Sequence, residues 1–161
     1  MDLEIRKMRP ADLPQVLELL RYWNLEPVAP SAEVPQPERT RLIVENTHVA
    51  VVAARIVGVG SFIGLSPTEA EGASFAVARE YRGTRVGSLL VVAGRREMYA
   101  RGIRKVYSET DRPENVNWLT KRFGYRIVGT VRKRHSFGDP TIERWTRLEA
   151  DLEPPFVAGV S

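Results

Sequence analysis

Cysteine is absent from this chain of 161 residues. The protein therefore has no disulfides, no thiolate metal site and no cysteine nucleophile, and direct transfer between two substrates is simpler than a covalent intermediate. Histidine is scarce, because only His48 and His135 are present and they lie far apart in sequence. Few histidines are therefore available for a histidine-based metal site or a catalytic triad, and we expect no metal.

The sequence also lacks an apolar run long enough to cross a bilayer. The N-terminus, Met1-Asp2-Leu3-Glu4, has acidic residues where a signal peptide would have an apolar core. We therefore expect a cytoplasmic protein. The length suits one domain with a real core, spanning residues 1–161, and 43% hydrophobic with 27% charged residues is ordinary for a folded chain.

Lysine is rare, with 4 lysines against 20 arginines and a net charge of +4. The forked guanidinium of arginine suits phosphate and carboxylate groups. This balance is typical of a protein that binds an anionic ligand or nucleic acid, but a solvated basic surface is the more common explanation. Charge alone therefore does not identify a partner.

The apolar pattern predicts strands that alternate with helices. Strands are expected at residues 3–8, 48–54, 56–65, 73–79, 103–109, 125–132 and 141–149, and helices from about residue 11, at 83–101 and at 114–123. On the first helix, the apolar face is expected to be Leu13, Val16, Leu17 and Leu20. Gly102 and Gly124 are placed to end the later helices.

Four prolines exclude regular structure between residues 27 and 37, which we expect to be a loop. The tail, residues 153–161, is expected to be extended or frayed. The order of elements predicts an α/β (α+β) fold, with a mixed central sheet of about seven strands and helices on both faces. Its parallel part should be the strand–helix–strand unit at residues 73–109.

The stretch from Arg79 to Leu90 joins an apolar strand to an amphipathic helix. The first turn of a helix offers unpartnered N–H groups and a partial positive charge, which suit phosphate. Gly83 permits a tight turn, Gly87 leaves room for a ligand, and Arg82 and Arg85 add charge. The pattern predicts phosphate binding, whereas the plainer alternative is a turn with glycine for geometry and arginine for solubility.

This stretch resembles the GNAT superfamily of N-acetyltransferases. The family's signature is arginine or glutamine, two residues, glycine, one residue, then glycine or alanine, at the start of the helix after the fourth strand. Arg82 fits the first position and Gly87 the last, whereas Arg85 replaces the middle glycine. We expect the Arg85 side chain to swing outward and bind a phosphate of coenzyme A (CoA).

The resemblance covers residues 3–149 and includes residues 121–125 (KRFGY), which are similar to the family's helix end followed by glycine and an aromatic. It implies a V-shaped split between the fourth and fifth strands, where acetyl-CoA would lie and pass its acetyl group directly to an amine. Backbone donors would stabilise the oxyanion. The residues implied in binding the pantetheine arm and the pyrophosphate are Phe75, Ala76, Val77, Arg82, Gly83, Thr84, Arg85, Val86, Gly87 and Ser88.

An acceptor amine arrives largely as ammonium, so a carboxylate is needed to take its proton. Glu109, which ends the strand after the CoA-binding helix, is the leading candidate, and Glu71, which begins the strand before it, is the second. Asp111 is a weaker third, and for each of these acids an ordinary exposed carboxylate is the simpler interpretation. No catalytic acid is carried over from the family, because Thr120 stands at its tyrosine position.

Several other signals have plainer explanations. Residues 58–64 imitate a dinucleotide-binding fingerprint, but the spacing is one residue too long and Ser66-Pro67 stands where the helix should run, so glycines for close packing or bulges are expected. Residues 132–135 (RKRH) could touch RNA, but are expected to be an exposed strand end or loop. Core roles are expected for Tyr107 and Tyr125. Trp23 and Trp118 either line the acceptor side or fill the core.

Three functions follow from the sequence. The first is an N-acetyltransferase acting on a small amine, an amino acid or a protein amine, with a pocket shaped by residues 24–40 and 132–140. The second is a non-catalytic acyl-CoA-binding or protein-interaction module on the same fold. The third, which we do not expect, is a nucleic-acid-binding domain. Edge strands invite pairing, so a homodimer through the last strands or the tail stays open, as does the acceptor.

Overall fold

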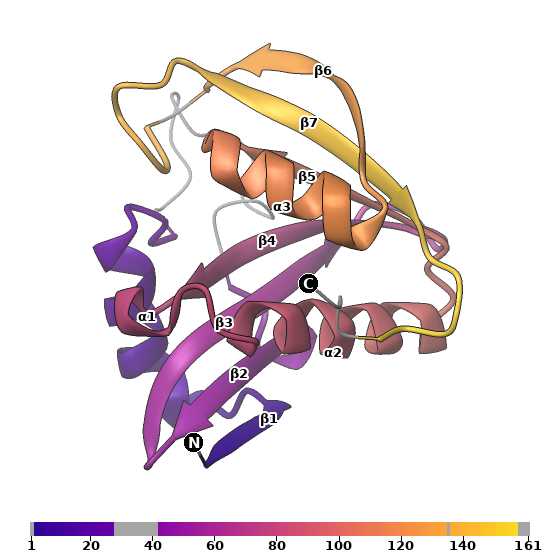
Figure 1. Ribbon diagram of the computed structural model, residues 1–161. Coiled ribbons are helices and arrows are strands. Elements are labelled where there is room, and N and C mark those ends of the chain that lie inside the picture. Colours follow the sequence, from indigo (N-terminus) through magenta and orange to yellow (C-terminus); the bar gives the residue numbers. More distant parts are fainter. Residues whose placement is uncertain (1, 28–41, 135, 158–161) are drawn as a thin grey trace.

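The computed structural model describes residues 2–27, 42–134 and 136–157. In this part of the chain, strands form one sheet in the order β1-β2-β3-β4-β5-β7-β6 (Figure 1). The strands are β1 (Leu3–Lys7), β2 (Thr47–Val52), β3 (Arg55–Gly64), β4 (Glu69–Val77), β5 (Lys105–Thr110), β6 (Arg126–Arg132) and β7 (Arg144–Asp151). Among the strands of the described residues, only β4 and β5 pair in parallel. The predicted mixed α/β sheet is therefore confirmed.

The helices match the apolar pattern in type but not at every boundary. They are η1 (Pro10–Asp12), α1 (Leu13–Tyr22), η3 (Val44–Asn46), η4 (Arg79–Tyr81), α2 (Val86–Ala100) and α3 (Pro113–Phe123). Gly102 and Gly124 follow α2 and α3 with φ of +95° and +68°, so the predicted helix stops are confirmed. The helix predicted from residue 83 begins only at Val86, because residues 83–85 form the turn before it.

The main core lies on both sides of β3. Gly58 faces α2, where a Cβ atom would meet Leu90 and Val86, so the glycine allows the helix to pack close to the sheet. Because side chains alternate along a strand, Val57 and Val59 face the other way, and both are fully buried. Helix α1 packs against β3 and β4 and closes this core with Val16, Leu19 and Leu20.

Two sequence-based details are wrong. Strand β4 begins at Glu69, four residues earlier than predicted, so Glu71 lies inside the strand rather than at its start. On α1, Leu13 is 39% exposed whereas Leu19 is buried, so the apolar face is rotated from the predicted one. Most of the proline-rich loop at 27–37 and the end of the 153–161 tail lie outside the described residues. No helix in the described ranges combines the length and apolarity needed to cross a membrane.

Candidate functional site

Strands β4 and β5 pair over three residues and then separate. The parallel register runs from Glu69 opposite Lys105 to Glu71 opposite Tyr107. Beyond this point β4 continues to Val77 and β5 to Thr110 with no further pairing between them. The two strands therefore form the V-shaped split that the family resemblance implied.

A β-bulge distorts β4 inside the split. Between the pairs Val59–Ala76 and Ser61–Ala73, Gly60 alone opposes Ser74 and Phe75, and Ser74 has a φ of +50°. A bulge leaves one residue of the strand without its ladder partner. The backbone near Phe75 can therefore turn its polar groups away from β3 and toward the split.

The backbone of Val77 also faces away from β3. Val77 is opposite Gly58, and the neighbouring N–H of Ala78 donates to Val57 O at 2.8 Å. In an antiparallel ladder this makes Val77 the non-hydrogen-bonded member, whose N–H and C=O point outward. The indole Nε1–H of Trp23 donates to this outward carbonyl at 2.9 Å.

A cavity of about 470 Å³ occupies the split and reaches the start of α2. This volume is within the usual range for small-molecule sites. Nine of the predicted residues line it, namely Phe75, Ala76, Val77, Arg82, Gly83, Thr84, Gly87, Glu109 and Asp111. The other four, Glu71, Arg85, Val86 and Ser88, are outside the lining.

The turn before α2 presents backbone rather than bulky side chains. Gly83 has a φ of +77°, which favours glycine. The amides of Val86, Gly87 and Ser88 are in the first helical turn, where no carbonyl of the preceding turn is available to them. A Cβ atom on Gly87 would lie 3.3 Å from Trp118, so this position has little room for a larger residue.

Two arginines stack on the Trp23 side chain at the cavity. The guanidinium carbon of Arg82 lies 5.0 Å from the centre of a Trp23 ring, and that of Arg112 lies 5.4 Å from it. Both arginines and Trp23 line the cavity. Trp118 packs on Phe75 and Phe123 at 5.9 and 5.1 Å between ring centres. Both tryptophans thus belong to the cavity wall.

Glu109 lies at the cavity with two guanidinium groups beside it. Its side chain is 10% exposed, and its carboxylate oxygens are 3.4 Å from Arg134 Nη2 and 3.7 Å from Arg147 Nε. Arg134 also stacks 5.3 Å from the Trp145 ring centre. Glu109 is therefore a positioned, largely buried acid and not the exposed strand-end carboxylate that was the simpler expectation.

Asp111 is tied to the β6–β7 loop. Its Oδ2 atom is 2.8 Å from Lys133 Nζ and accepts the Asp139 N–H at 2.6 Å. The side chains of Lys133 and Asp111 are 7% and 8% exposed. The expectation of a fully solvated basic run at residues 132–135 is therefore wrong for Lys133, whose charge is matched by a buried partner; His135 lies outside the described residues.

The loop that Asp111 holds is fixed from a second side by Asn24. The Gly138 N–H donates to Asn24 O at 3.0 Å, and Asn24 Nδ2 donates to Gly138 O at 3.1 Å. Phe137 and Gly138 line the cavity beside these bonds. The loop thus forms a preorganised wall of the cavity opposite the start of α2.

The remaining predicted residues have structural surroundings. Glu71 is buried, with 7% exposure. The Thr120 hydroxyl donates to the carbonyls of Val116 and Asn117 within its own helix. Tyr107 donates to Glu69 at 2.6 Å, and Tyr125, which also lines the cavity, packs beside the second core cluster. Neither the threonine nor these tyrosines replaces the tyrosine of the family pattern by its contacts.

Sequence reasoning did not single out Arg112, Trp145 and the buried role of Lys133. Arg112 precedes α3 and resembles any other arginine of a basic chain. Its distinguishing contact, Trp23, is nearly ninety positions away, so no local pattern signals it. Trp145 lies on the strand that was predicted at 141–149, but nothing in its neighbourhood in the sequence distinguishes it as a cavity residue.

Residues 11–125 match the family described as the acetyltransferase (GNAT) family. No curated protein sequence matches the chain. Ard1 from Thermoplasma volcanium has a similar structure, with a TM-score of 0.75 and 22% identity over 96% of this chain and 100% of that one.

Two further structures share the fold. Rv2747 from Mycobacterium tuberculosis, in complex with CoA and NLQ, has a TM-score of 0.67 and 18% identity over 93% of this chain and 99% of that one. The ribosomal-protein-S18-alanine N-acetyltransferase from Escherichia coli has a TM-score of 0.69 and 15% identity over 95% and 96%. The sequence match and the split sheet agree, and the chain belongs to the GNAT family of acetyltransferases.

Proposed function

We propose that this protein moves an acetyl group from acetyl-CoA directly onto an amine. One observation carries the proposal: β4 and β5 separate after Glu71 and Tyr107, and the cavity between them reaches the start of α2. An extended thioester arm can pair with free strand backbone while its diphosphate meets helix amides. Membership of the GNAT family and the CoA bound by the similar M. tuberculosis protein support this function.

The donor's diphosphate is proposed to bind at the turn before α2. Its oxygens would accept hydrogen bonds from the backbone N–H of Gly83 and from the amides of residues 85–88, while the Thr84 N–H donates to Tyr81 O at 3.3 Å. Arg82 supplies charge from the cavity side, where it has no ion pair with any described residue. Arg85, exposed at the helix start, is free to reach a phosphate at the outer edge.

The pantetheine arm is proposed to run along β4. The outward N–H of Val77 is available to it, while Trp23 takes the carbonyl of the same residue. Near the bulge, the N–H of Phe75 would point at the thioester oxygen, whereas Ala76 is in the hydrogen-bonded pair with Val59. Donors placed there stabilise the negative charge that develops as the carbonyl is attacked.

The chemistry is a direct displacement. The amine nitrogen attacks the thioester carbon, the carbon–sulfur bond breaks, CoA leaves as the thiolate, and a carboxylate takes the amine's proton. Glu109 is the proposed base because it lines the cavity from β5. Glu71 is the second candidate, since it marks the point where the strands part, and Asp111 the third, although the β6–β7 loop already engages it.

Calorimetry with CoA, followed by thioester cleavage with an amine panel, tests the proposal. In Gly87→Trp the new side chain must displace Trp118 or fill the cavity, so CoA affinity should fall on the order of a hundredfold. Arg82→Gln, a milder change, should cost roughly tenfold. Gly64→Trp is the matched control, because a Cβ atom there meets nothing within 4 Å.

Each result separates one alternative from another. Unchanged CoA affinity in Gly87→Trp would refute the donor site at α2. Tight CoA binding without transfer to any amine would favour the non-catalytic acyl-CoA-binding module. Transfer that Gly87→Trp abolishes and Gly64→Trp preserves would establish the acetyltransferase.

A homodimer through β6 is the assembly that we propose. This strand is at the edge of the sheet, and its Ile127 and Val128 side chains are 58% and 51% exposed. Edge strands with exposed apolar residues pair readily with a second copy. Sedimentation should give a dimer mass that falls to the monomer in Ile127→Lys; a monomer in the unmodified protein would exclude this assembly.

A further inference from the structure

Arg112 is a cation held at the cavity without a close anionic partner. Its side chain is 29% exposed, and the nearest carboxylate oxygen in an ion pair is that of Glu114 at 3.9 Å. Within the described residues, its guanidinium donates no hydrogen bond. A guanidinium has five N–H donors in a fixed fork, and partial burial without acceptors is unfavourable. This arrangement leaves the donors of Arg112 available to a ligand.

The other arginines that line the cavity are either exposed or paired. Arg82 and Arg122 are exposed, and Arg95 Nη2 donates to Phe123 O at 2.7 Å. Arg82 lies on the turn before α2, where the donor's diphosphate is proposed to bind. Arg112 is thus a half-buried cavity cation that neither the fold nor the donor accounts for.

Arg112 lies near the β6–β7 loop. Hydrogen bonds from Thr141, and to a smaller extent the charge of Arg112, lower the pKa of Asp139 in that loop. Trp23 contacts Arg82 of the donor turn as well as Arg112. The ring therefore connects the donor turn with Arg112, whose surroundings include the preorganised wall formed by Phe137 and Gly138.

A negative group lies in the same cavity close in sequence. Glu109, on β5, and Arg112, directly before α3, are three residues apart, and both line the cavity. A ligand with an amine and a carboxylate carries the opposite charges. Its ammonium would be attracted to Glu109, and its carboxylate could bind the arginine fork through two parallel hydrogen bonds.

We propose that Arg112 binds a carboxylate of the acceptor, and that the acceptor is an amino acid with a free carboxyl group. This inference rests on the acetyl transfer proposed above and names its substrate class. A protein N-terminus fits less well, because its first carboxyl group is an amide, which offers the guanidinium no negative charge.

Free amino acids and their amides test the substrate class. Thioester cleavage should be roughly tenfold to a hundredfold faster in kcat/KM with the preferred free amino acid than with its amide. Arg112→Met should remove that preference by slowing the free amino acid alone, while Arg112→Lys retains part of it. Lys121→Met is the matched control, since Lys121 is an exposed α3 cation outside the cavity lining.

Binding supplies a readout that needs no turnover. Calorimetry of N-acetyl amino acids and their amides, with and without CoA, should show carboxylate-dependent affinity that Arg112→Met abolishes. Equal affinity for acids and amides, or binding of neither, would overturn the proposal. Weaker CoA binding in Arg112→Met would instead assign this arginine to the donor and also overturn it. Failure of the unmodified protein to bind CoA would contradict the proposed function separately.

Discussion

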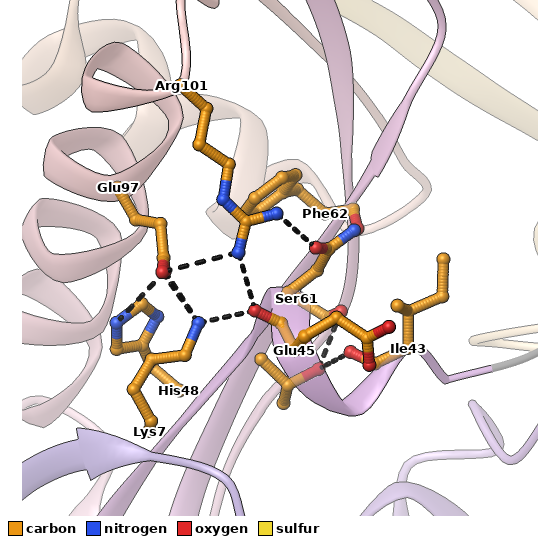
Figure 2. Close-up of polar contacts among 10 residues, drawn as sticks. Lys7, Ile43, Glu45, His48, Ser61, Phe62, Glu97 and Arg101 are labelled. Carbon is orange, nitrogen blue, oxygen red and sulfur yellow. Dashed lines mark hydrogen bonds and ion pairs between the residues drawn. The ribbon is translucent and has the colours of Figure 1, made fainter.

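The two ends of helix α2 differ in how their charges are matched. At its C-terminal half, Lys7 donates to Glu97 at 2.6 Å, and Arg101 donates to Asn46 Oδ1 and Glu45 O, both at 2.7 Å. Figure 2 shows Lys7 and Arg101 converging on Glu97 and on the Glu45 carbonyl, so that α2 is tied to β1 and to η3.

Near the N-terminal end, the guanidinium groups of Arg82 and Arg112 lie beside a cavity and donate no hydrogen bond to a described residue. They contact a face of Trp23 instead. Charged side chains that are paired within the chain hold secondary structure together. Charged side chains beside a cavity that have no such partner are sites where a ligand can supply the opposite charge. The comparison predicts that changes at one end affect stability and changes at the other affect binding and rate.

The largest effect is expected for Glu109→Gln, which keeps the shape but removes the proposed base. The value of kcat should fall roughly a hundredfold to ten-thousandfold across the pH range, because proton removal from the acceptor loses its carboxylate. Steady-state rates with acetyl-CoA in excess measure this. Glu149→Gln, at a β7 acid outside the cavity lining, is the control. An unchanged rate at every pH would leave Glu71 and Asp111 as the candidates.

The next effect concerns a matched pair that lies at the cavity itself. In Asp111→Asn, Lys133 keeps a charge at 7% exposure without its partner, which should cost about 3 kcal/mol in the free energy of unfolding. Urea denaturation measures this, and Asp111→Leu with Lys133→Met should cost less because neither charge remains. Full stability together with loss of kcat would instead identify Asp111 as the base.

A smaller effect is expected at the C-terminal half of α2. In Glu97→Gln the partly exposed cations Lys7 and Arg101 lose their shared carboxylate, so the free energy of unfolding should fall by about 1 kcal/mol. CoA affinity should stay unchanged. Calorimetry on the same variant checks the second half of the statement, and a weakened CoA complex would break the separation between the two ends of the helix.

Much of the fold could be predicted because its elements have strong periodicity. The hairpin between β2 and β3 was expected near Arg55, although its turn residues Ala53 and Ala54 have φ of +48° and +62° without the usual glycine or asparagine. The start of β4 was missed because Glu69 and Glu71 interrupt its apolar run, and burial of Glu71 overrides the low strand preference of that residue.

The candidate site was predictable only where it is local in sequence. The turn from Arg82 to Gly87 carries its own pattern, and the structure places it at the cavity. The contacts of Trp23 with Val77 and Arg112 join segments far apart in the chain, and so do those of Asp111 with Lys133. Such pairs depend on the folded sheet, so the acceptor side could not be derived from spacing.

His48 gives the smallest expected effect and tests how well the matched end is satisfied. Its buried Nδ1 atom has no hydrogen-bond partner among the described residues, and burial, followed by the charge of Lys7, lowers the pKa of His48 from the ordinary 6.5. Glu97 opposes this shift and Arg101 adds to it. The unfolded chain therefore binds the proton more readily than the native protein does. The contribution of His48 to stability is complete above pH 6.5 and is lost as the pH falls toward the lowered native value, by at most about 1.4 kcal/mol per pH unit.

Urea denaturation between pH 7.5 and pH 5 (roughly the range in which histidine titrates) should show a shallower decline in the free energy of unfolding in His48→Gln than in the unmodified protein, with His135→Gln as the control. Equal declines in all three proteins would mean that the pKa of His48 is the same in the native protein as in the unfolded chain.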